Sequence, residues 1–159
     1  MSRHASGILI YRLRGSKPEV FLVHPGGPFW KGKDKAAWSI PKGEFDPGSE
    51  DSLSAARREL SEETGFEATA DPEYWGEVKL TGGKILYVWG MPADFDPALI
   101  RSSSIEMEWP RNSGRKIRFP EIDRADWFDC DTAREKLHKG QVQLIDLLLN
   151  RLGLSEKSD

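Results

Sequence analysis

Apolar and polar positions along the chain follow two different periods, which predicts strands interspersed with helices. Short runs of β-branched and aromatic residues predict strands, and apolar positions that recur every three or four residues predict helices. The predicted strands are Ser6–Leu13, Glu19–His24, Trp38–Ile40, Tyr74–Leu80, Lys84–Gly90, Ile105–Trp109, Lys116–Phe119 and Ala125–Phe128. The predicted helices are Asp51–Thr64, Asp131–His138 and Gln141–Leu152. This order favours the α/β class, with a mixed sheet packed between helices in an α/β/α sandwich.

Glycine-rich segments indicate where neighbouring strands turn. Gly15–Pro18, Thr81–Gly83 and Asn112–Gly114 each lie between two predicted strands. We expect a turn at the first segment and hairpins at the other two. The connection over Pro25–Ala37 is rich in Gly, Pro and Lys, and we expect a long loop there. Gly65 stands where a left-handed residue commonly ends a helix.

The length and composition predict one globular domain. The chain has 159 residues, of which 38% are hydrophobic, and this is enough for one core. The last apolar helix is expected to end at Gly153, and the residues after Leu154 are polar. We therefore expect a single domain over residues 1–154 and a flexible tail over residues 155–159.

Charge and cysteine content exclude several classes of protein. With 23 Lys and Arg against 26 Asp and Glu, the net charge is -3, which argues against a protein held on nucleic acid or an anionic membrane by bulk charge. The single cysteine, Cys130, excludes an internal disulfide framework and a cysteine-based zinc cluster. Gly7–Tyr11 is too short for the core of a signal peptide, and Leu144–Leu149 is too short for a membrane span. These observations predict a cytoplasmic protein.

The helix predicted over Asp51–Thr64 concentrates negative charge near its end. At about 100° per residue, Glu59, Glu62 and Glu63 share an arc of about 100°. Like charges three or four residues apart repel each other by a few tenths of a kcal/mol per pair, and the helix dipole disfavours anions in the last turn. The arrangement is therefore unfavourable unless positive charge compensates it.

This acidic arc has two interpretations. A hard divalent cation such as Mg²⁺ or Mn²⁺ would stabilise it, because these ions prefer oxygen ligands and bind through a few carboxylates and substrate phosphates. Alternatively, the helix is a solvated, Glu-rich surface helix whose charge is screened by Arg57 and Arg58. The helix alone does not decide between the two.

The residues around the helix follow a spaced pattern. Glu50 is followed by seven residues and then by Arg58-Glu59-Leu60-Ser61-Glu62-Glu63-Thr64-Gly65-Phe66, and Pro41-Lys42-Gly43-Glu44 lies upstream. This pattern resembles the box of the MutT-like Nudix hydrolase family: Gly, five residues, Glu, seven residues, Arg-Glu-apolar-any-Glu-Glu-any-Gly-apolar. In this chain six residues separate Gly43 from Glu50. We expect the extra residue to extend the Asp46–Ser49 loop, where an insertion costs little.

The resemblance implies a Nudix-type α/β/α sandwich and a role for each residue of the box. By resemblance, Glu59, Glu62 and Glu63 are metal ligands, Glu62 is also catalytic, and the cofactor is Mg²⁺ with Mn²⁺ as a substitute. Arg58 would orient the catalytic carboxylates, and Glu50 would pair with Arg58 or contact the metal site. A forked guanidinium suits this role because it holds a carboxylate through paired hydrogen bonds.

The segment before the helix also resembles part of the family. Trp38-Ser39-Ile40-Pro41-Lys42-Gly43-Glu44 is similar to branches that act on nucleoside triphosphates or dinucleoside polyphosphates. We expect Trp38, Lys42 and Gly43 to contact the substrate. Gly43 would let the backbone turn tightly beside the metal and phosphates.

A further catalytic residue is expected outside the box. In this family a Glu on a loop before a late strand often supplies a base or a further ligand, and Glu121, six residues before Trp127, lies in a comparable place. Glu106 and Glu108 compete with Glu121 for this role. They share one face of a predicted strand, which is typical of a solvent-facing side.

The long loop offers candidate contacts for phosphates and for a base. The candidate phosphate contacts are Lys31, Lys33 and Lys35, besides Lys42. The candidate stacking residues are Phe29, Trp30 and Trp38. The alternative interpretation is that the lysines are simply solvated and that the aromatic side chains belong to the core.

Two other patterns do not carry a site. Residues 27–34 nearly fit a Walker A loop, but Asp34 replaces the Ser or Thr that binds Mg²⁺, and a strand instead of a helix is predicted to follow. His4, His24 and His138 lack the spacing of a zinc site.

Together these features predict a hydrolase that cleaves a phosphoanhydride bond in a nucleoside polyphosphate, either an NTP or a dinucleoside polyphosphate, with Mg²⁺ and water. Two alternatives stay open: a Nudix-fold sensor that binds a nucleotide without turnover, and hydrolysis of another derivative such as a nucleotide sugar or an RNA cap. The expected partner is the small-molecule nucleotide, with no stable nucleic-acid complex and no membrane. A homodimer is also left open.

Overall fold

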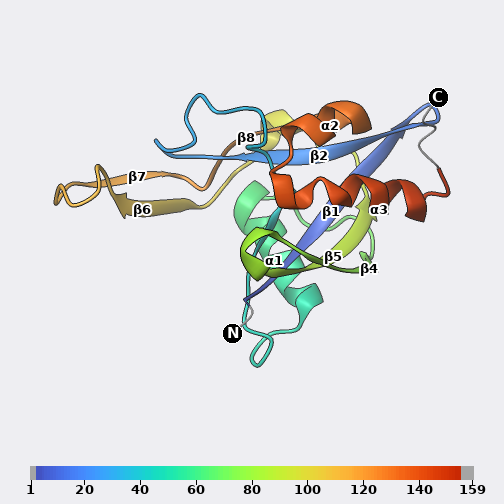
Figure 1. The fold of residues 1–159 in the computed structure, drawn as a ribbon, viewed down its shortest axis with the longest axis horizontal. Coiled ribbons are helices and arrows are strands. Elements are labelled where there is room, and N and C mark those ends of the chain that lie inside the picture. Colours follow the sequence, from blue (N-terminus) through green and yellow to red (C-terminus); the bar gives the residue numbers. More distant parts are fainter. Residues whose placement is uncertain (1–2, 155–159) are drawn as a thin grey trace.

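A computed structural model describes residues 3–154 and shows a mixed sheet with helices on both of its faces (Figure 1). The strands are β1 His4–Arg14, β2 Lys17–Pro25, β3 Lys42–Glu44, β4 Glu73–Lys79, β5 Ile85–Pro92, β6 Ser104–Glu108, β7 Lys116–Pro120 and β8 Ile122–Asp129. The helices are α1 Ser52–Thr64, α2 Cys130–Lys136 and α3 Gln143–Arg151, with 3₁₀ turns at Thr81–Gly83, Pro97–Leu99 and Lys139–Gln141. The strand order is β4-β5-β1-β2-β8, and β3 pairs with β1. The predicted α/β/α sandwich is confirmed.

Strand β1 lies in the middle of the sheet and contributes to both core layers. Leu9 packs in the layer that includes side chains of α2 and α3, whereas Ile8 and Ile10 pack in the layer that includes side chains of α1. Successive side chains of a strand point to opposite faces, so one apolar strand can support two layers. This explains why β1 is apolar at consecutive positions instead of alternate ones.

The same strand changes its antiparallel partner along its length. Its second half, Tyr11–Arg14, pairs with β2, and its first half, Ala5–Gly7, pairs with β3. On its other side β1 pairs in parallel with β5. Beyond Val20 the β2 strand leaves β1 and continues its pairing with β8. The sheet therefore opens between β2 and β3.

One predicted strand in this region is wrong and another was missed. Trp38–Ile40 makes only two single bridges, Val23 with Ser39 and Trp38 with Leu137. Its apolar side chains reflect burial in the core and not a continuous ladder. The ladder forms instead at β3, whose sequence Lys-Gly-Glu lacks the β-branched and aromatic residues that predict strands.

The other predicted elements are confirmed, with shifts at their ends. Helix α1 begins at Ser52, and Asp51 caps it. The last predicted helix begins with a separate 3₁₀ turn over Lys139–Gln141 before α3. The tail predicted over residues 155–159 lies outside the described residues. None of the helices within residues 3–154 is long and apolar enough to cross a membrane.

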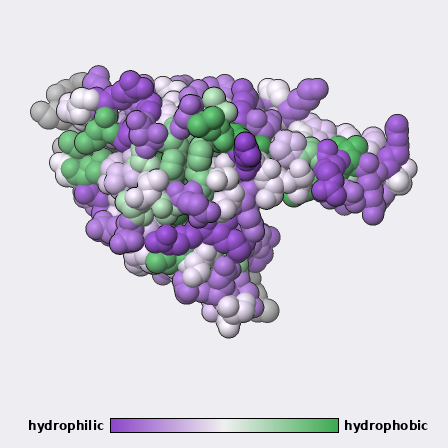
Figure 2. All heavy atoms as spheres, turned by 180° about the vertical axis from the view of Figure 1, so that it is seen from behind, coloured by the Kyte–Doolittle hydropathy of each residue, from purple (hydrophilic) through white to green (hydrophobic). Residues whose placement is uncertain are grey.

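The second predicted hairpin is confirmed, and it stands apart from the main sheet. Within the described chain, β6 and β7 pair only with each other. They extend away from the body of the molecule in the ribbon view and project from it in the space-filling view (Figures 1 and 2). We call residues 104–120 the arm. Glu121 follows directly at its base.

Candidate active site

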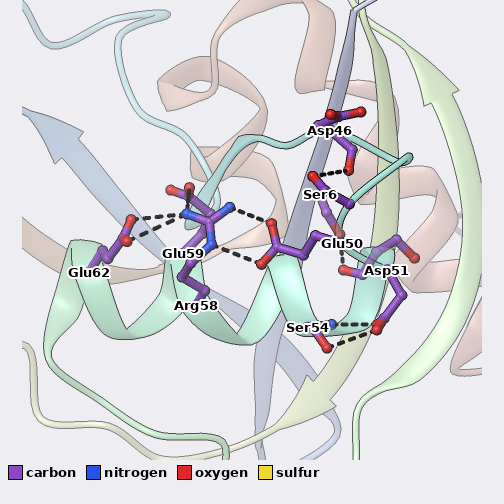
Figure 3. Close-up of polar contacts among 10 residues, drawn as sticks. Ser6, Asp46, Glu50, Asp51, Ser54, Arg58, Glu59 and Glu62 are labelled. Carbon is purple, nitrogen blue, oxygen red and sulfur yellow. Dashed lines mark hydrogen bonds and ion pairs between the residues drawn. The ribbon is translucent and has the colours of Figure 1, made fainter.

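Helix α1 carries three of the predicted ligands, and local contacts fix both of its ends. The Asp51 side chain accepts hydrogen bonds from the backbone N–H of Ser54 (2.8 Å) and from its hydroxyl (2.9 Å; Figure 3). Gly65 has a φ of 78°, which confirms the left-handed end predicted from the sequence. Ser6 of β1 donates to the carbonyl of Ser52 (2.6 Å), so the helix is also tied to the sheet.

The buried face of α1 mixes apolar and acidic side chains. Ala56 and Leu60 pack in the core, and Glu59 and Glu63 lie on the same face with only 6% and 7% of their surface exposed. Residues three and four apart share a helix face, so the packing of Ala56 and Leu60 in the core also buries Glu59 and Glu63. Glu62 lies at the edge of this face, and 43% of its side chain is exposed.

Glu121 joins Glu59 and Glu63 from the base of the arm. Each of the three carboxylates offers an oxygen, and these oxygens lie within 4.8 Å of one another. Backbone hydrogen bonds hold Glu121 in place: its N–H donates to the carbonyl of Ser103 (2.7 Å), and its carbonyl accepts from the N–H of Gly26 (2.9 Å). The structure thus brings Glu121 to the box, as predicted.

Glu106 and Glu108, which competed with Glu121, lie on the arm. Glu106 forms ion pairs with Lys116 and Arg118 of the opposite strand, with separations of 4.0 Å and 3.8 Å. Glu108 accepts hydrogen bonds from backbone N–H groups of the turn at the arm's tip. Both side chains have partners on the arm, and neither belongs to the cluster of three carboxylates.

Arg58 connects the carboxylates of the box (Figure 3). Its Nε and Nη2 each donate to the carboxylate of Glu50 at 2.9 Å, and its Nη1 donates to Glu59 at 2.8 Å. The same Nη1 lies 3.2 Å from a carboxylate oxygen of Glu62. The predicted pairing of Glu50 with Arg58 is confirmed, and hydrogen bonds from Arg58 lower the pKa of Glu50. Arg58 holds Glu59 in a fixed orientation because its other nitrogens are themselves held.

Gly43 is needed for a different reason from the one predicted. It lies within β3 opposite Ser6, and its φ is not positive, so no tight turn occurs there. A Cβ built on Gly43 would lie 2.0 Å from the carboxyl carbon of Glu59. Glycine therefore allows the β3 backbone to approach the Glu59 carboxylate. The backbone N–H of the preceding residue, Lys42, donates to the carboxylate of Glu63 at 3.2 Å.

The extra residue between Gly43 and Glu50 is absorbed in a local turn, as predicted. The Asp46 carbonyl accepts hydrogen bonds from the backbone N–H groups of Ser49 and Glu50, both at 3.0 Å. Because Glu50 still reaches Arg58, the insertion leaves the contacts of the box intact.

Burial makes the two inner carboxylates hold protons more tightly than usual. Burial raises the pKa of Glu63 well above its ordinary value, and the charge of Glu121 raises it further, while Lys42 opposes the shift. Burial also raises the pKa of Glu59, against the lowering effect of Arg58. Both shifts express the cost of an ionised carboxylate away from water.

These residues fit a hard divalent cation. A cation among buried carboxylates would offset the cost of their charge, and a set of oxygen ligands suits Mg²⁺ or Mn²⁺. Glu59, Glu63 and Glu121 are the residues that would hold it. The carboxylate of Glu62 is turned to Arg58, so its predicted part as a metal ligand stays a prediction.

A cavity of about 620 Å³ opens beside this cluster, at the gap between β2 and β3. Glu63 and Glu121 line it together with three cationic residues, Arg3, Lys42 and Lys84. Its volume is typical of sites for small molecules. The cavity therefore combines carboxylates suited to a metal with cations suited to phosphate oxygens.

Two of these three cations were not found by sequence reasoning. Arg3 precedes β1 and Lys84 precedes β5, and only the parallel register of β1 with β5, in which His4 lies opposite Ile85, brings them together. Lys84 also donates to Glu44 at 2.9 Å. No local pattern distinguishes either residue from other surface cations.

The three lysines of the long loop are not among the residues that line the cavity, whereas Lys42, the first residue of β3, lines it. Lys33 instead places its Nζ over the ring of Phe29, 3.6 Å from the ring centre. Lys31 and Lys35 are exposed. The alternative interpretation, that loop lysines are solvated, fits these two residues.

The aromatic candidates separate into two groups. Phe29 and Trp30 line the cavity, with their ring centres 5.0 Å apart. Trp38 does not line it: only 3% of this residue is exposed, and its indole N–H donates to Asp34 at 2.8 Å. The substrate contact predicted for Trp38 is therefore corrected to a place in the core.

Buried His24 anchors the long loop. Its Nδ1 lies 2.9 Å from the carboxylate of Asp123, and its Nε2 lies 2.6 Å from the carbonyl of Lys33. Both ring nitrogens thus have protein partners, which agrees with rejecting a histidine zinc site. This anchoring role could not be predicted from local patterns, because Lys33 and Asp123 lie far from each other along the chain.

A family model described as the NUDIX domain matches residues 1–148. This chain belongs to the Nudix family. The match extends well beyond the box and confirms the enzyme class that the box predicted, a Nudix hydrolase. No curated protein matches the sequence.

Solved structures of other Nudix proteins share the fold. The NUDIX domain of Shewanella oneidensis NrtR, complexed with ADP-ribose, is 16% identical, with 96% of this chain and 89% of that chain covered and a TM-score of 0.65. A C. elegans Ap4A hydrolase is 21% identical, with 94% and 98% covered and a TM-score of 0.64. The MutT protein of Methanosarcina mazei is 18% identical, with 97% and 96% covered and a TM-score of 0.60. At these identities the likeness shows the fold alone.

Proposed function

We propose that this Nudix protein hydrolyses a phosphoanhydride bond in a nucleoside polyphosphate, either an NTP or a dinucleoside polyphosphate, and that the reaction depends on Mg²⁺. The observation that carries the proposal is a cavity in which acidic and cationic residues meet. Its carboxylates suit a divalent cation, and its cations, Arg3, Lys42 and Lys84, suit the oxygens of a polyphosphate.

We assign the metal to Glu59, Glu63 and Glu121, because each offers an oxygen within 4.8 Å of the others. When bound, Mg²⁺ would supply positive charge against the phosphate oxygens and make water a better nucleophile. Glu62 accepts a hydrogen bond from the Arg58 guanidinium, and we assign it the task of holding that guanidinium in place beside Glu59.

The chain's own residues divide the remaining tasks, and Glu121 takes one of them in addition to holding the metal. Water adds to one phosphorus while the bridging P–O bond breaks, and a carboxylate must take the water's proton. We assign this task to Glu121, because it lines the cavity and is less buried than Glu59 or Glu63. Lys42 offsets the negative charge that develops on the leaving phosphate.

The structural neighbours suggest which substrates to test. One is an Ap4A hydrolase, and another is complexed with ADP-ribose. Ap4A and ADP-ribose both contain a phosphoanhydride bond linked to adenosine, which is the kind of bond that we propose is cleaved here.

The proposal is tested by assaying nucleoside triphosphates, diadenosine tetraphosphate, ADP-ribose and nucleotide sugars, with Mg²⁺ and with EDTA. We expect hydrolysis of at least one nucleoside polyphosphate with Mg²⁺ and none with EDTA. Glu63→Gln should lower kcat by about 100-fold or more, because it removes a charged ligand without changing shape.

Glu67→Gln is the matched control, since Glu67 is an exposed residue just beyond α1. It should keep the parental rate. Nucleotide binding without turnover by the parent protein would contradict the proposal and favour the sensor alternative.

We further propose that residues 1–154 act as one domain in the cytoplasm and take no membrane or stable nucleic-acid partner. Size-exclusion chromatography with light scattering would test whether two copies associate, which the sequence left open.

A further inference from the structure

The arm has two chemically different faces. On one face, Ile105 of β6 lies opposite Phe119 of β7, and Met107 lies opposite Ile117. On the other face, Glu106 lies opposite Arg118, with which it forms an ion pair. Because residues two apart in a strand share a face, the apolar side is continuous along the arm.

Part of this apolar face reaches the cavity described above. Ile105, Met107 and Phe119 line the cavity, although 41% of Ile105 and 40% of Met107 are exposed. Phe29 and Trp30 of the long loop line the same cavity. Exposed apolar side chains that gather at a cavity mark a place where a ligand can bury them.

The loop and the arm are packed against each other at their bases. A Cβ built on Gly27, which has a φ of +95°, would lie 2.5 Å from the ring of Phe119. The N–H of the preceding residue, Gly26, bonds to the carbonyl of Glu121 at the base of the arm. The two segments are thus held together beside the carboxylates, and the apolar residues continue from the charged ones.

The geometry points to a clamp for the nucleobase of the substrate, formed by Ile105, Met107 and Phe119 of the arm together with Phe29 and Trp30 of the loop. This inference rests on the proposed function, because it takes the phosphates to bind at Arg3, Lys42 and Lys84. A nucleotide matches the cavity in both respects: a flat apolar ring at one end and a chain of negative charge at the other.

The chemistry of the clamp determines how it recognises a base. Phe29, Ile105 and Phe119 carry no side-chain hydrogen-bonding group, and Trp30 offers only an indole N–H. Such side chains bind the faces of a ring and do not identify its edge, and stacking of this kind is tolerant of the base. The clamp should therefore contribute to affinity for every base and should discriminate between adenine and guanine only weakly.

The test compares two double variants of the arm. Ile105→Ala with Met107→Ala removes the β6 part of the apolar face beside the cavity. Glu106→Ala with Arg118→Ala removes an ion pair of the opposite face without altering the net charge. For the first variant we expect KM for ATP and for GTP to rise by about tenfold, with kcat within about twofold of the parent. The second variant should keep both constants.

Phe29→Ala gives a second measurement on the loop side of the clamp. Phe29 is exposed, so its replacement does not remove core packing. Phe29→Ala should also raise KM for ATP and for GTP. Inhibition by AMP should weaken in both clamp variants by the same factor as KM, whereas inhibition by inorganic pyrophosphate, which has no base, should not change.

The clamp and the proposed reaction fail in different ways. If nucleotides are hydrolysed but the apolar-face variant has the parental KM, the clamp is wrong and the proposed function stands. A loss confined to kcat would also overturn the clamp, because it would place the arm at the reacting end. If no nucleotide is hydrolysed, calorimetry with AMP still decides: equal binding to the parent and the apolar-face variant overturns the clamp.

Discussion

Helix α1 and the arm contribute to the same cavity, yet they are built in opposite ways. The helix is capped at both ends, and its Ala56 and Leu60 are buried in the core. The arm pairs only with itself within the described chain, and every residue of β6 is exposed. The helix carries the carboxylates, whereas the arm carries apolar side chains to the cavity.

This difference separates reactivity from recognition. Catalytic groups must be held within a fraction of an ångström, and a buried helix provides that rigidity because any shift disturbs the core. An exposed hairpin can change its side chains at little cost in stability, which suits contacts that set the affinity for a ligand. Four predictions test this contrast, beginning with the largest effect.

The contrast should be greatest in stability. Leu60→Ala should lower the free energy of unfolding by about 2–5 kcal/mol, because it leaves a cavity in the core beside Glu59 and Glu63. Ile117→Ala on the arm should lower the free energy of unfolding by less than about 1 kcal/mol. Urea denaturation monitored by circular dichroism measures both. Equal losses would mean that the arm is as important to stability as the helix.

The close contact of β3 with the helix should be sensitive to one methyl group. Gly43→Ala should lower kcat by about 100-fold, because the new Cβ cannot coexist with the Glu59 carboxylate in its present position. Gly48→Ala, in the exposed turn that follows β3, is the control and should have little effect. Full activity in Gly43→Ala would show that Glu59 does not need its observed position.

The fork of Arg58 should matter more than its charge. Arg58→Lys should reduce activity by about 10- to 100-fold, since lysine keeps the charge but loses the paired hydrogen bonds that link Glu50 to Glu59. Arg57→Lys is the control, because the Arg57 guanidinium lies 3.6 Å from exposed Asp71. This variant should keep the parental activity. A similar loss in both variants would indicate a general effect on the helix.

The smallest effect concerns the metal-free protein. The raised pKa of Glu63 means that folding favours its protonated form, so this group lowers stability as the pH rises above the ordinary Glu range. Without metal, the parent should therefore lose more Tm between pH 5 and pH 8 than Glu63→Gln does, by a few degrees. Glu67→Gln should follow the parent.

Added Mg²⁺ should raise Tm at pH 8 in the parent and much less in Glu63→Gln. Identical pH profiles in the parent and Glu63→Gln would contradict this.

The helix and the placement of its carboxylates could be predicted from the sequence because local rules determine them. Helical periodicity places Glu59 and Glu63 on one face, and Asp51 and Gly65 mark the two ends. The pairing of Arg58 with Glu50 was expected from the resemblance to the family, and the structure confirms it. Each of these relations spans only a few turns of one helix. The resemblance to the family then added Glu121, which no local rule identifies.

The rest of the cavity could not be predicted, because it depends on contacts between distant segments. Arg3 and Lys84 meet through the register of two parallel strands, and Gly43 matters because of an atom on a different element. Trp38 was misplaced because an aromatic residue beside a loop has the same local pattern whether it faces a cavity or the core. The arm was predicted as a hairpin, but nothing in its alternation shows that one face lines the same cavity as Phe29.

Glu121 is joined by a single peptide bond to the last residue of the arm, and this has a consequence for how the protein can diversify. The turn at the far end, around Asn112–Gly114, can lengthen or shorten by loop changes that leave the pairing near Phe119 in register. One residue inserted beside Glu121 would swing its carboxylate away from Glu63. Insertions and deletions among relatives should therefore occur at the tip of the arm and not at its base beside Glu121.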